Sequence, residues 1–182
     1  MKIDPHNIQL RSNWLRKPFS ASSYQSWLVD EGSLTARLQS GYADFHVKTI
    51  RQQDAKPIMD EAAVLKRKQS TAANVRDVLL MGNQEALVYA HSVLPHSSLR
   101  GEWAKLGKLG NKPLGATLFS DPRVKRTPLN YKKLSKHHAL YRKAVANLPQ
   151  APTYLWARRS IFSLKCARIL VTEVFLPTIT DQ

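Results

Sequence analysis

Two charged residues stand among apolar neighbours in segments whose alternation is typical of β-strands. In residues 75–80, period-two spacing puts Arg76 on the apolar side, and in residues 169–175 Glu173 takes the equivalent place. An isolated buried charge costs free energy, so each residue requires a partner or a ligand. Three interpretations are open. The two residues pair with each other, they lie on exposed faces, or they recognise a ligand by charge.

Two predicted helix starts add backbone donors. Ser33 is expected to cap a helix whose first turn includes the amide of Leu34, and Pro113 opens a helix whose first turn includes the amide of Leu114. First-turn N–H groups have no intrahelical acceptor and lie at the positive end of the helix dipole. They are ready donors to a carboxylate or an oxyanion. Every helix has such donors, so this pattern is not specific alone.

The other reactive side chains form no recognised catalytic pattern. The histidines at positions 91, 96, 137 and 138 lack zinc-like spacing, and Cys166 has no histidine near it in the sequence. No G-x-G-x-x-G, Walker-type or G-x-S-x-G motif occurs. We therefore expect no metal site, and nucleotide-binding and hydrolase functions lack support.

The elements that position these residues are predicted from periodicity and turn signals. Helices are expected around residues 24–28, over 34–40 with Gly41 as the stop, at 114–119 and, as a basic helix, over 129–148; residues 52–73 have a helix-like polar character. Strands are expected at 45–49, in a hairpin over 74–95, and at 159–164 and 169–176. These elements predict an α+β fold with an antiparallel sheet and helices packed on one side.

Length and composition favour one soluble domain. The chain has 182 residues, of which 43% are hydrophobic, and no apolar run approaches the length of a membrane helix. Residues 1–6 lack the apolar core of a signal peptide. The single cysteine excludes an internal disulfide. We expect a cytoplasmic protein.

The charge is strongly positive and unevenly distributed. The formal net charge is +15, and residues 123–147 contain eight lysines and arginines and no acidic residue. Such a field attracts anions, which include nucleic acid, a membrane surface and a small polyanionic metabolite. A solvated surface explains the same charge. Aromatic and cationic residues alternate in this segment, so an RNA-binding function through residues 123–147 is one alternative.

Several stretches, in order along most of the chain, resemble the chorismate pyruvate-lyase family, which makes 4-hydroxybenzoate for ubiquinone in bacteria. The matching stretches are D-E-G-S-L-T-A-R-L (30–38), T-I-R (49–51), V-R-D-V-L-L (75–80), L-G-N-K-P-L-G (109–115) with L-F (118–119), L-W-A-R-R-S (155–160) and L-V-T-E-V-F-L-P (170–177).

The resemblance implies a single domain over residues 1–182, with a ligand pocket buried beneath flap loops. This chain departs from the family at about 123–152, where a longer and far more basic connection is interpreted as an insertion. In that family an arginine on a central strand binds the ring carboxylate, and Arg76 occupies the matching position. A glutamate in the final T-E-x-F-L-P strand contacts the ring hydroxyl, which here is Glu173. Two backbone contacts of the family fall on Leu34 and Leu114.

The resemblance also implies the reaction. The lyase removes the enolpyruvyl ether from C3 of chorismate and a proton from C4, which gives pyruvate and 4-hydroxybenzoate in the first committed step of ubiquinone biosynthesis. Aromatisation drives this elimination, so no metal, nucleotide or redox cofactor is expected. A monomer is implied, with chorismate and 4-hydroxybenzoate as its ligands and with neither nucleic acid nor membrane insertion.

Two departures and one further alternative accompany the resemblance. The family commonly has methionine at Leu34, and it often has arginine at His91, which predicts one fewer permanent cation near the pocket. The same sheet architecture occurs in UTRA domains, the small-acid sensors of bacterial transcription factors. Those domains follow a DNA-binding domain, and only about forty residues precede the first expected strand here. The enzyme is therefore preferred to the sensor.

Overall fold

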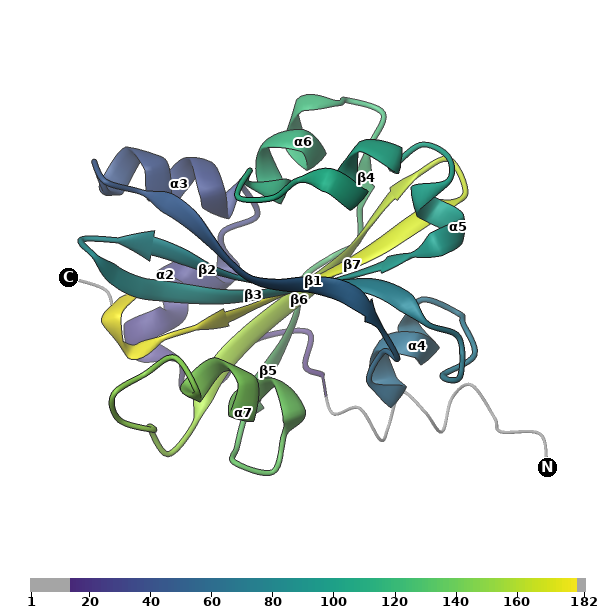
Figure 1. The fold of residues 1–182 in the computed structure, drawn as a ribbon. Coiled ribbons are helices and arrows are strands. Elements are labelled where there is room, and N and C mark those ends of the chain that lie inside the picture. Colours follow the sequence, from purple (N-terminus) through teal and green to yellow (C-terminus); the bar gives the residue numbers. More distant parts are fainter. Residues whose placement is uncertain (1–13, 180–182) are drawn as a thin grey trace.

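The computed structural model describes residues 14–179, which fold around one antiparallel sheet (Figure 1). The strand order is β1-β2-β3-β7-β6-β4, and β5 pairs with β6 beside β4. The strands are β1 (His46–Ala55), β2 (Ala73–Gly82), β3 (Glu85–Pro95), β4 (Lys125–Arg126), β5 (Asn130–Leu134), β6 (Leu155–Leu164) and β7 (Ala167–Phe175). The predicted α+β class and antiparallel sheet are confirmed.

The centre of the sheet is the hairpin expected over residues 74–95. Strands β2 and β3 pair in a register that sets Arg76 opposite Ser92, and β3 in turn pairs with β7 so that Ala90 is opposite Glu173. The turn residues are Asn83 and Gln84, which both have positive φ, as a tight turn matching the strand twist requires. This register carries Arg76 and Glu173 onto the same face of neighbouring strands.

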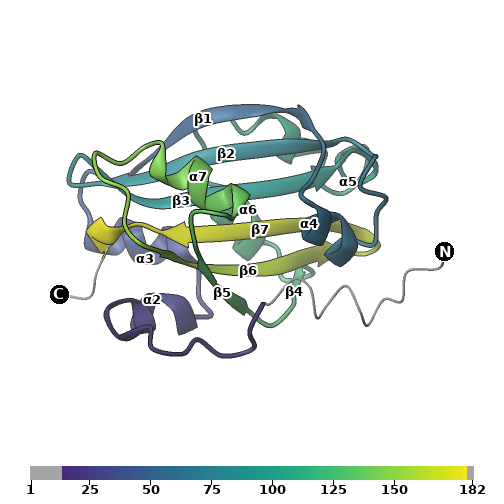
Figure 2. The same ribbon diagram turned by 90° about the horizontal axis from the view of Figure 1, so that it is seen from below.

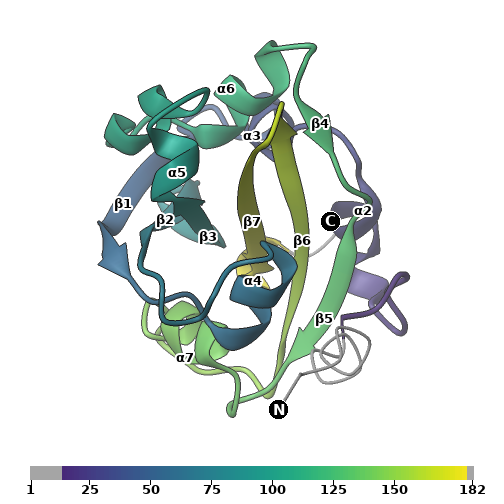
Figure 3. The same ribbon diagram turned by 90° about the vertical axis from the view of Figure 1, so that its right-hand side faces the viewer.

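Helices cover both faces of the sheet, not one face as predicted. They are α2 (Gln25–Val29), α3 (Leu34–Gly41), α4 (Met59–Val64), α5 (His96–Leu99), α6 (Leu114–Ser120) and α7 (Ala139–Val145), with short 3₁₀ turns η1 (Ser22–Tyr24), η2 (Ala104–Lys108) and η3 (Pro177–Ile179). Helices α3 and α6 lie on one side of the sheet, whereas α4 and α7 lie on the other (Figures 1 and 3).

The burial of consecutive residues in β2 explains this two-sided cover. Val78 and Leu80 pack in a core with Leu34 and Leu38 of α3. Between them in the sequence, Leu79 points to the opposite face, where it packs in a second core that includes residues of α7. An apolar strand of this kind has to be covered on both faces, because its side chains alternate. Figure 2 shows α7 and α4 in front of the strands on that second face.

The basic helix expected over residues 129–148 is wrong. Residues 130–134 form strand β5, which pairs with β6, and only Ala139–Val145 are helical, as α7. His138 caps the N-terminus of α7, because its Nδ1 accepts a hydrogen bond from the amide of Leu140 at 3.2 Å. The apolar residues in this segment have helical spacing, but they belong to two elements, β5 and α7, which pack on the same core.

The other expected elements differ mainly at their ends. In the segment 52–73, β1 continues to Ala55 and only Met59–Val64 are helical. Within residues 14–179 we find no helix with the length and apolarity needed to cross a membrane. Residues 1–6, where the sequence indicates no signal peptide, lie outside the described residues.

Candidate active site

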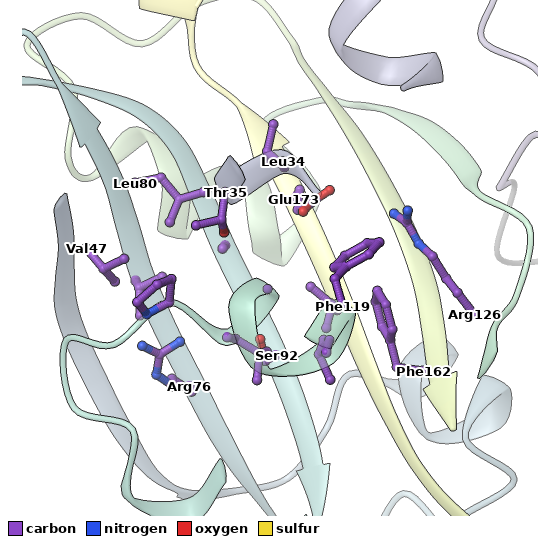
Figure 4. A pocket seen from close by; sticks show the side chains of 17 residues that line it. Leu34, Thr35, Val47, Arg76, Leu80, Ser92, Phe119, Arg126, Phe162 and Glu173 are labelled. Atoms are coloured by element: carbon purple, nitrogen blue, oxygen red, sulfur yellow. The ribbon is translucent and has the colours of Figure 1, made fainter. Parts of the chain in front are cut away.

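A pocket lies between the sheet and helices α3 and α6, and all four predicted site residues line it (Figure 4). Arg76 comes from β2, Glu173 from β7, and Leu34 and Leu114 from the first positions of α3 and α6. The rest of the lining is mostly apolar and comprises Thr35, Val47, Val78, Leu80, Ala90, Ser92, Pro113, Gly115, Leu118, Phe119, Arg126, Phe162 and Val171. Apolar walls with a few convergent polar groups are typical of a small-molecule site.

Arg76 is a buried cation without a carboxylate partner among residues 14–179. The residue is 2% exposed, its Nη2 donates to the carbonyls of Gly110 and Lys112 at 2.9 Å each, and its buried Nε has no hydrogen-bond acceptor within this range. No ion pair found in this range includes it. Burial lowers the pKa of Arg76 to about 10, so the side chain is still charged near neutral pH.

Glu173 lies at the opposite end of the pocket from Arg76 (Figure 4). Its Oε2 accepts a hydrogen bond of 2.5 Å from Nε of Arg158, a neighbour on β6 that is fully buried. The Glu173 side chain keeps 16% of its surface exposed. The first interpretation, an ion pair between Arg76 and Glu173, is therefore wrong, because Glu173 pairs with Arg158 instead.

Two segments form the roof of the pocket, and we call them the flaps. The first flap is residues 30–41, which include α3, and the second is residues 109–120, which include α6. They meet where a Cβ on Gly115 would lie 2.8 Å from Oγ1 of Thr35. Only glycine permits this close approach, so α3 and α6 can lie against each other above the sheet.

The amides of Leu34 and Leu114 begin the two flap helices, as predicted. Ser33 caps α3 by accepting a hydrogen bond from the amide of Ala36 at 3.3 Å, and Pro113 precedes α6 in an extended conformation. Because both amides are at the first helical position, neither has an intrahelical acceptor. Both leucines are buried residues of the pocket lining.

Sequence reasoning missed two arginines that contribute to this site. Arg158 holds Glu173, and Arg126 lines the pocket from β4. Both stand in short basic runs, so their residue types and spacing do not distinguish them from the neighbouring surface cations. Pairing with β6 is what directs Arg126 inwards.

His91 does not face the pocket, which corrects the expectation of a lost cation there. The neighbouring residues Ala90 and Ser92 line the pocket, so His91 points to the opposite face of β3. There its Nδ1 lies 2.5 Å from Asp77 and its Nε2 lies 3.1 Å from Glu61. The histidine that replaces the family's arginine at this position therefore lies in a buried charge cluster with Asp77 and Glu61, on the face of the sheet opposite the pocket.

Sequence comparison relates the chain to one family over nearly its whole length. The family model described as chorismate lyase matches residues 9–182. A protein of Methylobacillus flagellatus named "Probable chorismate pyruvate-lyase" is 44% identical over 170 residues, which cover 93% of this chain and 96% of the relative. A protein of Nitrosospira multiformis with the same name is 45% identical over 177 residues, covering 96% and 98%.

Solved structures with a similar fold include effector domains of transcriptional regulators. The effector domain of PhnF from Mycobacterium smegmatis aligns with a TM-score of 0.57 at 14% identity, covering 81% of this chain and 90% of that one. The C-terminal domain of the histidine utilization repressor from Pseudomonas syringae aligns with a TM-score of 0.54 at 8% identity, covering 76% and 95%. At these identities the likeness concerns the fold alone.

Proposed function

Since the chain belongs to the chorismate lyase family, we propose that its pocket binds chorismate and eliminates pyruvate from it, leaving 4-hydroxybenzoate. The C3–O bond breaks with its electron pair on oxygen, C4 loses its proton, and the enolate that departs takes up one proton at its methylene carbon to become pyruvate. The ring becomes aromatic, which supplies the driving force. The elimination is redox-neutral and balances without a further reactant.

The observation that carries this proposal is the unpaired Arg76. Arg76 has no carboxylate partner among residues 14–179, and burying an unpaired guanidinium costs free energy. An anionic ligand that pairs with Arg76 would offset this cost. The ring carboxylate of chorismate supplies that charge, and a planar guanidinium can bind it through two hydrogen bonds. The apolar walls then contact the faces of the ring. We assign Arg76 the role of orienting the substrate.

Glu173 and two backbone amides complete the proposed site. With the ring carboxylate on Arg76, the opposite end of the ring bears the C4 hydroxyl and points towards Glu173, which hydrogen-bonds it and takes part in proton transfer during the elimination. The amides of Leu34 and Leu114 donate to the bound ligand from the flap helices. No step assigned to these residues requires a metal or redox cofactor.

Neither alternative has a comparable observation in its favour. The sensor interpretation rests on fold likeness at 14% identity or less to the effector domains above. The RNA interpretation relied on the basic segment 123–147, most of which was expected to form one helix, and the structure divides this segment into β4, β5 and α7. An unpaired cation inside a small pocket instead fits a small anionic ligand, as chorismate is.

Cellular context and assembly are part of the same proposal. One chain supplies the four site residues, so we infer an active monomer. The free, exposed thiol of Cys166 suits the reducing cytoplasm. The reaction is the first committed step of ubiquinone biosynthesis in the family, and we propose the same place for this chain.

The direct test mixes the purified, metal-free protein with chorismate and measures 4-hydroxybenzoate and pyruvate together. We expect both products in equal amounts, above the uncatalysed rate and without added cofactor. Tight binding of chorismate without turnover would favour the sensor. Absence of both binding and turnover would favour the RNA-binding alternative.

A further inference from the structure

Arg126 is a second arginine in the pocket, and its guanidinium is held by neutral groups. Its Nε donates to Oγ of Ser160 at 2.8 Å, and its Nη1 donates to the backbone carbonyl of Glu31 at 2.7 Å. None of the ion pairs among residues 14–179 includes it. These two bonds fix the guanidinium in place, and no carboxylate among residues 14–179 forms an ion pair with it, although the charges of Glu173 and Glu31 are near enough to interact.

The surroundings of Arg126 keep this charge partly out of water. Its guanidinium carbon lies 5.5 Å from the ring centre of Phe119 and 5.2 Å from that of Phe162, two aromatic residues of the pocket wall. Burial lowers the pKa of Arg126, although the nearby charge of Glu173 opposes this effect. A cation in such a place interacts strongly with an anion that enters the pocket, since the local dielectric is lower than that of water.

The two unpaired arginines lie at different ends of the pocket. Figure 4 shows Arg76 at one end and Arg126, with its guanidinium directed towards the Glu173 end, at the other. Arg126 and Phe119 also border an adjoining open hollow, whose other lining residues are Glu31, Thr127, Pro128 and Leu129. Arg126 is therefore accessible both from the pocket and from outside it.

Chorismate has two carboxylates whose positions match this arrangement. The first is on C1 of the ring, and the second is on the enolpyruvyl group, joined through oxygen to C3. Because C3 is adjacent to C4, a substrate with its C1 carboxylate on Arg76 and its C4 hydroxyl near Glu173 carries the second carboxylate at the Glu173 end. The product 4-hydroxybenzoate retains only the first carboxylate.

We propose that Arg126 binds the enolpyruvyl carboxylate of chorismate and so distinguishes the substrate from the product. The inference rests on the proposed function, and it adds a specificity residue to that site. Substrate then contacts two arginines, and the aromatic product contacts one. Cleavage of the C3–O bond separates the two carboxylates, so the contribution of Arg126 to holding the ring ends with the reaction.

The test compares two stable aromatic probes that do not react. The first is 4-hydroxybenzoate, and the second is 3-(carboxymethoxy)-4-hydroxybenzoate, which adds an ether-linked carboxylate beside the hydroxyl. Binding of both is measured by calorimetry for the full chain and for Arg126→Gln. We expect the substitution to weaken the dicarboxylate about tenfold or more and 4-hydroxybenzoate less than about threefold. The KM for chorismate should rise in parallel with the first value.

Two further variants separate charge from structure. Arg126→Lys keeps the charge but loses the planar fork, and we expect it to restore part of the affinity for the dicarboxylate. Arg123→Gln removes a cation three residues away that pairs with Asp121 and is 67% exposed, so it should leave both affinities unchanged. An equal loss for both probes in Arg126→Gln would mean that the residue only supports the first flap, and would overturn the inference.

The outcomes also separate this inference from the proposed function. If the unaltered protein converts chorismate and Arg126→Gln has the same KM and the same preference between probes, the inference is wrong and the lyase stands. If the unaltered protein makes neither product but shows the expected preference, the lyase fails and Arg126 remains a binding residue. If the unaltered protein binds neither probe and does not convert chorismate, both are overturned.

Discussion

Arg158 joins Glu173 to the first flap. Its Nε donates to the carboxylate of Glu173 at 2.5 Å, and its Nη1 donates to the backbone carbonyls of Trp27 at 2.7 Å and Asp30 at 2.5 Å. One buried guanidinium therefore holds both the carboxylate at the end of the pocket and the chain that leads into α3. The position of Glu173 and the position of the roof above it depend on the same side chain.

Glu173→Gln tests whether this carboxylate transfers a proton. The amide keeps a similar shape and an acceptor for Arg158 but cannot accept a proton, so we expect kcat to fall at least about tenfold, which corresponds to about 1.4 kcal/mol. Steady-state kinetics with chorismate, together with 4-hydroxybenzoate affinity, provide the measurement. A smaller loss of kcat would show that Glu173 only positions the substrate.

Arg76→Gln tests the carboxylate clamp. Loss of a charge-assisted interaction with the ring carboxylate should weaken 4-hydroxybenzoate about 10- to 100-fold, equivalent to about 1.5–3 kcal/mol. Thermal unfolding with and without 4-hydroxybenzoate is the readout, because a ligand that binds only the native state raises Tm. The unaltered protein should show this rise, and Arg76→Gln should lose most of it. Unchanged turnover in the variant would rule out the clamp.

Gly115→Ala tests the contact between the flaps. The new methyl group would lie 2.8 Å from Oγ1 of Thr35, so either the Thr35 side chain or the two helices must shift. We expect 4-hydroxybenzoate to bind several-fold more weakly and to dissociate faster, measured by stopped-flow fluorescence. Gly41→Ala is the matched control, because a Cβ there has nothing within 4 Å. Equal dissociation rates in the two variants would contradict a role for the close approach.

The buried cluster behind the sheet predicts a pH-dependent stability. Burial alone would lower the pKa of His91, but the neighbouring carboxylates of Glu61 and Asp77 outweigh it and raise the pKa from 6.5 to about 9. Two further cations face Asp77, Arg51 at 2.8 Å and Lys143 at 3.6 Å. A raised histidine pKa stabilises the fold fully below its unfolded value, and this contribution disappears as the pH rises through the folded value.

We therefore expect the free energy of unfolding to decline between about pH 6.5 and pH 9, by roughly 1–3 kcal/mol. Asp77 contributes in the opposite direction. Although burial opposes it, the hydrogen bond and charge of His91 depress the pKa of Asp77, so its contribution is lost as the pH falls below the usual aspartate range. Urea titrations that extend from below the usual aspartate range to above about pH 9 measure both limbs, and His91→Gln should flatten the alkaline one. An unchanged alkaline slope in the variant would assign that slope to other groups.

The local sequence pattern was sufficient to find a site residue where a charge interrupts the apolar side of a strand or where a signal marks the start of a helix. Arg76 and Glu173 could be found because each puts a charge on an otherwise apolar side, and Leu34 and Leu114 because a cap and a proline mark helix starts. The resemblance then brought these four positions together. The structure agrees that they line one pocket, while their roles towards the ligand remain predictions.

Local pattern failed where pairing over long distances decides the outcome. Arg126 lies in a two-residue strand among other cations, and only its pairing with Phe162 of β6 turns it into the pocket. The segment 130–134 has apolar residues at spacings that fit a helix, yet β6 offers it an edge to pair with. Tertiary hydrogen bonds of this kind are invisible to periodicity, because the partner lies far along the chain.

The two flaps come from opposite flanks of the central hairpin, and neither contributes a strand to the sheet. The roof can therefore lift while every strand stays paired, so admitting a ligand need not involve partial unfolding of the sheet. Substitutions at the contact between Thr35 and Gly115 act on the residence time of the product, whereas those in the two cores act on the survival of the fold. Leu34 and Leu38 of α3 belong to the first core, so substitutions at those two positions should change residence time and stability together.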